Sequence, residues 1–490
     1  MELPFKFPVL QTLSVLTVPI KRLIYTIEKP RVFGAFLYLL NLKHLNCFYK
    51  MRSRINTVLS MLLFLLAGCS SEKNKKSTDD QNSSYKKFEL LSPPEIGDFQ
   101  GMKFYEGGFS SLSYIPGSNL EFYAVNDRGP NLEMNDHPKA EGNEVKLFPF
   151  PDYSPKVVRL RVRNNTLQTA FAMAVKSPVS KLTTSGLPPA YLQNENSETA
   201  WSEPNATVVQ GDDWGLDAEG ITVGNDNDIW ICEEYRPSIW RLFDKTAKTW
   251  EVFAPAFGSD QNEHSDILKP LPDVLRKIRP NRGFEGITMT PNGMIWAAIQ
   301  SPLQNPDEKT GNTTRLNRLV KLNPKTGETH MFLYEMNEGV GDIRQKDWKI
   351  GDLTAVNDSQ LLVLEQAEKG NDKFADVYLV DINKATPLQD DNESGKTPEQ
   401  FLYAENAQNH GVKTVTKTHL VDLTQNGFTK EHGKAEGLTI VNDTTIAVMN
   451  DNDYGVRLSD DLETVTETNV KTYLWLIKTP AALSVKRKND

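Results

Sequence analysis

Short β-type runs, separated by turns, recur along most of the chain. Four segments share one order, in which a β-type run is followed by a turn rich in Asn, Asp, Gly or Pro and then by a second β-type run: AEGITVGNDNDIWICEE (218–234), FEGITMTPNGMIWAAIQ (284–300), GDLTAVNDSQLLVLEQ (351–366) and AEGLTIVNDTTIAVMND (435–451). A fifth, SSLSYIPGSNLEFYAVND (110–127), follows the same order with a two-residue insertion. This order predicts β-hairpins.

A second hairpin follows most of the first ones. The examples are SIWRLFDKTAKTWEVFA (238–254), NRLVKLNPKTGETHMFLY (317–334) and KVVRLRVRNNTLQTAFAM (156–173). Two hairpins make four antiparallel strands, which is the blade of a β-propeller. We therefore predict an all-β fold: one β-propeller domain of five or six four-stranded antiparallel blades. The number depends on whether residues 177–213 form another blade. The last apolar run, 472–477, is expected to pair with the first strand near 88–91 and close the ring.

The N-terminal residues predict that the protein is exported, and they are not expected to belong to the folded domain. Residues 51–69, MRSRINTVLSMLLFLLAGC, have the basic, apolar and small-residue zones of a secretory signal in order. Their end resembles a bacterial lipobox, which implies cleavage before Cys69 and lipid attachment to its sulfur. A plain membrane anchor is the alternative, but the apolar run is shorter than the roughly 20 residues that a spanning helix needs. We expect an upstream extension (1–50) before a start at Met51, a lipoprotein signal peptide (51–68), a disordered tether (69–87), the propeller (88–480) and a polar tail (481–490).

The composition and net charge exclude several classes of protein. Apolar residues make up 39% of the chain, enough to bury a real core, and three cysteines are too few for a disulfide framework or a zinc ribbon. Cys232 lies in an apolar run and is expected to be buried. The net charge is −9, and residues 1–68 hold nine Lys or Arg and two Asp or Glu, so the chain from Cys69 onward carries −16. Such an acidic body disfavours nucleic acid and suits divalent cations.

Acidic residues recur where the first hairpin of each blade begins and ends. Because the first and last residues of a hairpin lie side by side, these carboxylates are expected at one mouth of the central channel. They repel one another unless a cation lies between them, and hard oxygen ligands suit calcium, with magnesium or manganese also possible. The alternative is that these acids cap turns or pair with nearby Arg. The candidate metal ligands are Asp127, Glu219, Glu233, Glu285, Asp352, Glu365, Glu436 and Asp451.

Basic residues lie close to these acids in the sequence. Arg128 follows Asp127, Arg236 follows a pair of glutamates, and Arg282 and Lys434 each precede a Glu. Interleaved acids and guanidinium groups suggest recognition of an anion. The alternative is that Arg128 and Arg236 only neutralise the neighbouring carboxylates.

Five motifs in order give the chain a family resemblance: Asn126-Asp127-Arg128-Gly129, Asp217-Ala218-Glu219-Gly220-Ile221, Glu233-Glu234-Tyr235-Arg236, Phe284-Glu285-Gly286-Ile287 and Ala435-Glu436-Gly437-Leu438. As a set they resemble the phytase-like family described as having esterase-like activity of phytase. The resemblance covers roughly residues 88–480 and implies a β-propeller and a metal-dependent hydrolase of phosphate or carboxylate esters.

The same resemblance implies a set of roles for residues at the mouth. Glu219, Glu233, Arg128 and Arg236 would be catalytic, with Arg128, Arg236, Arg282 and Lys434 binding a small anionic ester. The sequence has no GxSxG elbow, so a serine hydrolase of the α/β type is unsupported. A non-catalytic propeller that binds a ligand or a protein is the alternative. The expected location is the cell envelope, with a lipid anchor at Cys69 and a preference for the outer membrane. The sequence leaves the oligomeric state open.

Overall fold

The computed structural model describes residues 83–488, with gaps at 142, 180–181, 190–197, 244–245, 256–267 and 389–394. The predicted signal peptide and residues 69–82 of the predicted tether lie outside the described residues, whereas residues 85–87 of that tether form part of the first strand of the fold. The chain divides into two units, Met1–Gln81 and Asn82–Asp490, and the second carries the fold described below. No helix in the described part of the chain has the length and apolar character needed to cross a membrane.

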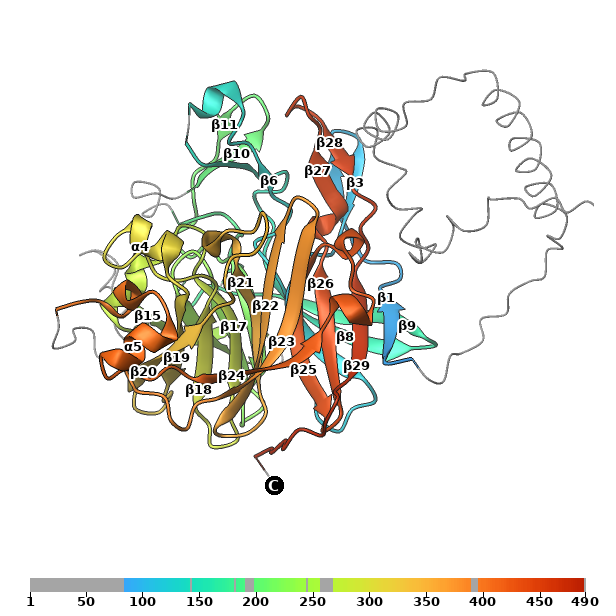
Figure 1. The fold of residues 1–490 in the computed structure, drawn as a ribbon. Helices are drawn as coiled ribbons and strands as arrows, with labels where there is room; N and C mark the ends of the chain where they lie inside the picture. The colour runs from blue at the N-terminus through green and yellow to red at the C-terminus, as the bar shows by residue number, and fades with distance from the viewer. Residues whose placement is uncertain are drawn as a thin grey trace, which may run out of the picture. The chain divides into compact units, whose positions relative to one another are not determined.

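Five antiparallel sheets form the blades of a propeller (Figure 1). Blade one is β4 (Phe109–Tyr114), β5 (Glu121–Asn126), β8 (Lys156–Arg163) and β9 (Thr166–Ala174). Blade two is β12 (Ala218–Val223), β13 (Ile229–Glu233), β14 (Ser238–Leu242) and β15 (Thr249–Ala254), extended by a short parallel strand, β16 (Leu268–Pro270). Blade three is β17 (Phe284–Met289), β18 (Ile295–Ile299), β19 (Leu316–Leu322) and β20 (Thr329–Glu335). Blade four is β21 (Lys349–Ala355), β22 (Gln360–Lys369), β23 (Asp372–Asp381) and β24 (Thr416–Asp422). Blade five is β25 (Lys434–Asn442), β26 (Thr445–Asp451), β29 (Tyr473–Lys478) and β1 (Tyr85–Glu89).

The ring closes by pairing the two ends of the fold. The inner strands contact one another in the order β4, β12, β17, β21, β25 and back to β4. In blade five, β1 forms the outer strand and pairs antiparallel with β29, with Phe88 opposite Leu474. The predicted propeller and its closing contact are therefore confirmed, and the number of blades is five. Apolar side chains fill the spaces between adjacent blades, and Trp240, Trp296 and Trp475 are completely buried there.

Three small sheets lie at one end of the propeller, above the blades in Figure 1. They are β2 (Glu95–Phe99) with β3 (Met102–Tyr105), β27 (Val456–Leu458) with β28 (Val465–Glu467), and β6 (Leu132–Glu133), β7 (Val145–Leu147), β10 (Thr199–Glu203) and β11 (Thr207–Val208). They share an apolar core that includes Phe104, Trp201 and Val456. We call this layer the cap. Residues 177–213 contribute β10 and β11 to the cap rather than a sixth blade.

Helical structure in the described residues is limited to short segments between strands. The longest are α4 (Glu308–Thr313) and α5 (Ala404–Asn409), and the others are η1 (Pro138–Ala140), η4 (Asp273–Lys277), η5 (Gln345–Asp347), η6 (Pro398–Phe401), η7 (Thr424–Asn426), η8 (Lys430–His432) and η9 (Asp453–Gly455). The long connection in blade four carries η6 and α5, and the buried carboxylate of Glu399 fixes it to blade three by pairing with Arg318 at 2.6 Å.

A β-bulge occurs at the same place in the inner hairpin of every blade. In blade two, Ala218 lies opposite Glu233 but Gly220 lies opposite Cys232, so Glu219 is the extra residue of the bulge. The same shift occurs in the other four hairpins. A bulge re-aims the side chain that it carries. The extra residues are Ser110, Glu219, Glu285, Gly351 and Glu436.

The residue after each bulge faces the axis of the propeller. Three blades have glycine there, and a Cβ on Gly286 would lie 2.7 Å from the Asp352 carboxylate. Blade one has Ser111 and blade four has Asp352, and the Ser111 hydroxyl donates to the Asp352 Oδ2 atom at 2.8 Å. The same oxygen accepts the Leu438 amide at 2.9 Å, and Ser111 accepts the Ile221 amide at 3.1 Å. Ser111 and Asp352 therefore join the inner strands of blades one, two, four and five across the axis.

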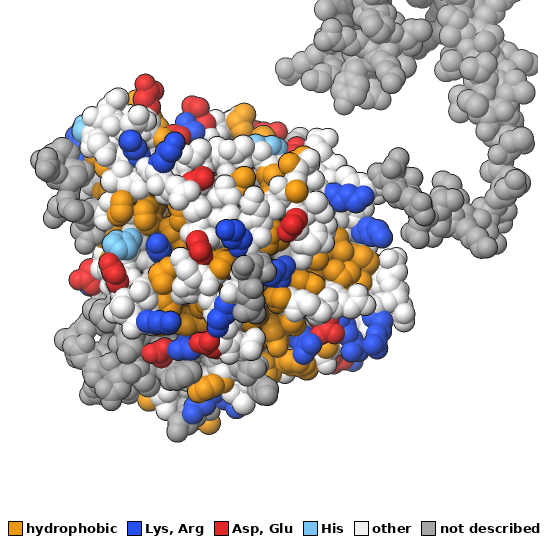
Figure 2. Space-filling model, turned by 90° about the horizontal axis from the view of Figure 1, so that it is seen from below, with side chains coloured by type: hydrophobic (Ala, Val, Ile, Leu, Met, Phe, Trp, Pro, Cys, Tyr) orange, Lys and Arg blue, Asp and Glu red, His pale blue; other side chains and the backbone are white. Residues whose placement is uncertain are grey.

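The C-terminal segment crosses the opposite end of the propeller. The Leu483 amide donates to the Asp443 carbonyl in blade five, and the Lys486 amide donates to the Val356 carbonyl in blade four. The Lys488 ammonium reaches the Asn225 carbonyl in blade two at 2.7 Å. Seen from below, this end shows charged side chains of both signs dispersed among apolar ones (Figure 2). The segment thus ties together the turns of three blades.

Candidate functional site

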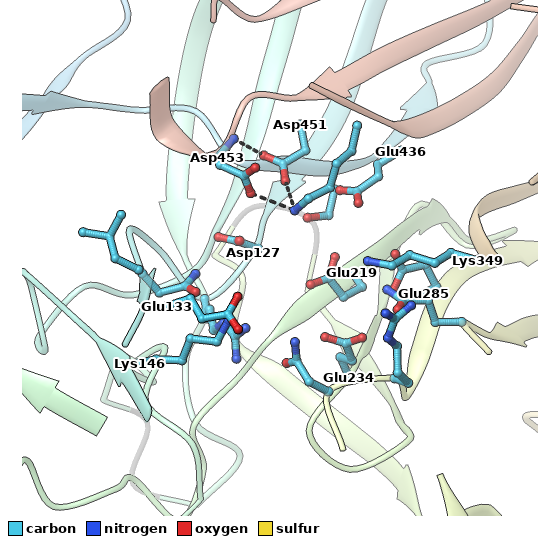
Figure 3. A pocket seen from close by; sticks show the side chains of 18 of the residues that line it. Asp127, Glu133, Lys146, Glu219, Glu234, Glu285, Lys349, Glu436, Asp451 and Asp453 are labelled. Carbon is cyan, nitrogen blue, oxygen red and sulfur yellow. Dashed lines mark hydrogen bonds and ion pairs between the residues drawn. The ribbon is translucent and has the colours of Figure 1, made fainter. Parts of the chain in front are cut away.

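A cavity of about 570 Å³ lies at the mouth of the propeller that faces the cap. Its floor is made by the first residues of the inner strands and the last residues of the strands next to them, and its side wall is made by cap residues such as Leu132, Val456 and Leu458. Acidic and basic side chains dominate the lining and point into the cavity (Figure 3).

Three positions recur at this end of the inner hairpin in every blade, and ten of the fifteen residues that occupy them line the cavity. Two form a cross-strand pair at the open end of the inner hairpin, and the third is the bulge residue. We call these the three mouth positions. In blades one to five the pairs are Gly108 with Asp127, Asp217 with Glu234, Gly283 with Gln300, Lys349 with Gln366, and Lys434 with Asp451, and the bulge residues are Ser110, Glu219, Glu285, Gly351 and Glu436.

Blade two is acidic at all three mouth positions. Carboxylate oxygens of Asp217, Glu219 and Glu234 lie within 4.8 Å of one another. All three residues are buried, and the Glu234 Oε1 atom accepts no hydrogen bond from the described residues. In blade three, Glu285 is only 1% exposed and its Oε2 atom likewise has no hydrogen-bond partner. Buried carboxylate oxygens without donors are costly unless a cation or water reaches them.

The electrostatics of the mouth favour the protonated forms of several of these acids. Burial, together with the nearby Glu285 and Asp217, raises the pKa of Glu219 well above its ordinary value. Burial and then Asp217 raise the pKa of Glu234 to about 7. The pKa of Glu436 is raised to about 8 by burial. A divalent cation would favour the ionised forms.

Arg128 positions part of the acidic cluster rather than projecting free into the cavity. Its Nη1 atom lies 2.6 Å from Glu198 Oε2 and 3.2 Å from Asp217 Oδ2. The same nitrogen donates to the Tyr235 hydroxyl at 3.2 Å, and the Arg128 backbone amide donates to Asp217 Oδ1 at 3.3 Å. Arg128 therefore neutralises Glu198 and orients Asp217 from behind.

Besides the exposed Arg457, two cations that line the cavity, Arg282 and Lys349, form no close ion pair, although the Glu285 carboxylate acts on both through space. Arg282 donates to the Ser301 hydroxyl at 3.3 Å, and no carboxylate of the described residues lies within ion-pair distance of Arg282 or Lys349. The pKa of Lys349 is lowered to about 8, first by the neighbouring Arg282 and then by burial. Lys434 differs, because it pairs with Asp451 at 3.0 Å and with Asp453 at 2.7 Å (Figure 3).

The structure brings eight of the predicted site residues to one cavity and places four others outside its lining. The eight are Asp127, Glu219, Glu285, Glu436, Asp451, Arg128, Arg282 and Lys434. The four outside it are Glu233, Glu365, Asp352 and Arg236. Asp352 follows the bulge and faces the axis, because Gly351 holds the bulge position in blade four.

Alternation of side chains at the end of a strand explains the placement of Glu233 and Glu365, whereas Arg236 lies in the turn between β13 and β14. Glu233 directly precedes the mouth residue Glu234, so its side chain points to the other side, where it accepts from the Ser238 hydroxyl at 2.7 Å. Glu365 precedes Gln366 in the same way and pairs with Lys417. Arg236 is 2% exposed and lies over the Trp214 ring at 4.8 Å. The expectation that these residues line the channel mouth was therefore wrong.

Sequence reasoning missed Asp217, Glu234, Lys349 and Asp453. Glu234 could have been found by aligning Asn126-Asp127, Glu233-Glu234 and Asn450-Asp451, because the second residue of each doublet faces the mouth. Asp217 and Lys349 share the other paired position, two residues before the bulge. Asp453 has no such signal, since its position depends on the turn of η9.

The cation-free protein should lose stability as the pH rises through the neutral range. The raised pKa values of Glu234 and Glu436 mean that the folded chain keeps protons that the unfolded chain releases near its ordinary value of 4.5. The contribution of these groups to stability is therefore greatest below about pH 4.5 and falls until about pH 8. In excess chelator, calorimetry should give a lower Tm at about pH 8 than at about pH 5.5. Excess calcium should raise the Tm mainly at the higher pH; an equal rise at both would contradict the expectation.

Fold and site together define a five-bladed β-propeller with a carboxylate-rich mouth under a cap. The sequence profile of the family Phytase-like, described as esterase-like activity of phytase, matches residues 105–454, and the chain belongs to this family. An uncharacterized secreted protein of Arthroderma benhamiae is 30% identical over 105 residues, which are 18% of this chain, and the chain spans 20% of that relative's length.

Solved structures also share similarity with the chain at low sequence identity. A PQQ-bound aldose sugar dehydrogenase from Streptomyces coelicolor is 9% identical, with a TM-score of 0.28, covering 79% of this chain and 100% of the other. A virginiamycin B lyase from Staphylococcus aureus is 10% identical, with a TM-score of 0.28, covering 80% of this chain and 99% of the other.

Proposed function

We propose that this protein is a metal-dependent hydrolase of small anionic phosphate or carboxylate esters, with calcium as the preferred cation. The observation that carries the proposal is the group of three buried carboxylates in blade two, beside two cations that form no close ion pair with the described residues. The family described by esterase-like activity of phytase supports the same class of reaction.

The residues present suit a hard divalent cation. Asp217, Glu219 and Glu234 would hold it, and Glu285 stands beside them with an unpartnered oxygen. The donors in this group are all oxygen atoms, which calcium prefers and which zinc sites of the His and Cys type do not resemble. When bound, such a cation polarises an ester oxygen and lowers the pKa of a coordinated water.

Arg282 and Lys349 would bind the anionic part of the substrate. Once the carboxylates of blades two and three are neutralised, the two cations are left without compensation, and an anion is the ligand that satisfies both. The same positive charge would stabilise negative charge that develops on the ester oxygens during hydrolysis. Arg128, which the sequence suggested for this role, is held by Glu198 and Asp217 and would serve to position the acids.

The proposal includes export. The signal-like segment 51–68 and the secreted relative support passage across a membrane, and the lipobox-like end supports a lipid on Cys69. Ser70, in place of an aspartate after Cys69, favours residence at the outer membrane. Intact mass measurement of the protein from cells should then show a chain that begins at Cys69 and carries acyl groups.

The test is hydrolysis by the purified protein of a panel of phosphate monoesters and carboxylate esters, first with calcium and then with excess chelator. We expect turnover that chelator abolishes. Lys349→Met should lower kcat/KM by about 10- to 100-fold because it removes a charge that contacts the substrate, whereas Lys325→Met, at an exposed turn, should leave it unchanged. Calcium binding without turnover of any ester would instead support a non-catalytic binding propeller.

A further inference from the structure

Blades two and five carry closely related mouth positions. Both have a glutamate at the bulge, Glu219 and Glu436. Both have an acid at the end of the second strand, Glu234 and Asp451. They differ at the remaining position, where blade two has Asp217 and blade five has Lys434.

The Lys434 ammonium lies among the acids of its own blade. Its Nζ atom is 3.0 Å from Asp451 Oδ2 and 2.7 Å from Asp453 Oδ1, and Asp451 Oδ1 also accepts the Asp453 amide at 2.8 Å. Within the Lys434–Asp451 ion pair, the aspartate is 1% exposed and is therefore buried. The Lys434 side chain is 41% exposed, and its ammonium would repel a divalent cation placed beside the same carboxylates.

The acids of blade two have no comparable internal cation. The Glu234 Oε1 atom is buried without a hydrogen-bond partner among the described residues, whereas both Asp451 oxygens are engaged. Arg128 contacts Asp217 but also compensates Glu198, so its single charge is shared. At this position the two blades therefore differ by two units of charge, because blade two has an aspartate where blade five has a lysine.

We propose that Lys434 is a built-in counter-ion that takes the place of a second metal ion, so that the mouth binds a single divalent cation, at blade two. The metal part of this inference rests on the proposed function. It assigns Lys434, which the sequence suggested as a substrate-binding residue, to the acids of its own blade. The predicted ring of metal ligands then consists of two groups. The carboxylates of blade two bind the cation, and the carboxylates of blade five pair with Lys434.

The inference predicts that changing one residue creates a second site. Lys434→Asp gives blade five the acidic pattern of blade two, and the number of calcium ions bound per chain, measured by isothermal titration and by metal analysis after gel filtration, should rise by one relative to the wild type. Lys325→Asp is the matched control, because it makes the same change of charge at an exposed turn. That control should leave the number of ions unchanged.

The outcomes separate this inference from the proposed function. A folded Lys434→Asp protein that binds the same number of ions as the wild type would overturn the inference, as would a wild-type protein that already binds two ions at the mouth. If Lys434→Asp does not fold, Lys434→Met replaces it with the same expected gain of one ion. A wild type that binds calcium without turnover would count against the proposed function alone, because the number of ions bound by variant and wild type still decides the role of Lys434. A wild type that binds no ion would contradict both.

Discussion

Replacing both Glu219 and Glu234 by glutamine should weaken calcium binding by more than about 100-fold, since even partners one layer away from a metal change affinity by roughly 10- to 100-fold. The two residues occupy two of the three mouth positions of blade two, and their oxygens lie within 4.8 Å of each other and of Asp217. Glutamine keeps the size of the side chain but removes the charge that attracts the cation. Isothermal titration with calcium measures the change directly.

The measurement of calcium affinity is accompanied by an expected change in stability and by a matched control. The substitutions should raise the stability of the cation-free protein at neutral pH, because they remove buried carboxyls whose pKa values are raised by burial. A control with Glu328→Gln and Glu338→Gln, at exposed side chains far from the mouth positions in sequence, changes the net charge equally and should bind calcium as the wild type does. An affinity that survives in the folded mouth variant would exclude blade two as the metal site.

Asp352→Ala should destabilise the fold by about 3–5 kcal/mol, because several buried donors lose their acceptor at once and a cavity opens on the axis. Asp352 accepts hydrogen bonds from Ser111 Oγ, the Leu438 amide and the Leu353 amide, at 2.8, 2.9 and 2.8 Å. These donors belong to the inner strands of blades one, five and four. The loss is therefore expected to affect the ring as a whole and not a single blade.

Urea unfolding followed by tryptophan fluorescence would measure this effect. Asp342→Ala provides a control at an exposed aspartate and should change the free energy of unfolding by less than about 0.5 kcal/mol. Because Asp352 lies outside the cavity lining, calcium affinity of the folded Asp352→Ala protein should stay close to that of the wild type. A free energy of unfolding equal to that of the wild type would show that the axial contacts contribute nothing to closure of the ring.

The hairpins could be predicted from the sequence because they are local. The turn-separated β-type runs of each blade define strands and turns within a short stretch of chain, and the closing pair of β1 with β29 follows from the need to cover sheet edges. The cap could not be predicted, because its strands are short and come from distant parts of the chain. In one of its sheets, β7 and β10 pair in parallel across a long connection.

The candidate site was predictable at the level of the mouth and not at the level of every side chain. Counting along a strand assigns faces correctly only when no residue is inserted, and a bulge reverses the assignment for everything on one side of it. This is why Asp352 was placed one position away from the residue that matches Glu219. The choice of Glu233 has a different cause, because the side-chain alternation at the end of β13 was assigned one residue early and Glu234 is the residue that lines the cavity.

Ser111 and Asp352 are bonded across the axis and the C-terminal segment crosses the far end, so a ligand can reach the cavity from the cap side without breaking either set of contacts. A ligand that enters the cavity from the cap side would also leave from the cap side. A long polymer cannot thread through such a site, so only its terminal unit can reach the floor, and any attack on a chain would proceed from the end inward. Released product would stand in the path of the next molecule and compete with it for entry.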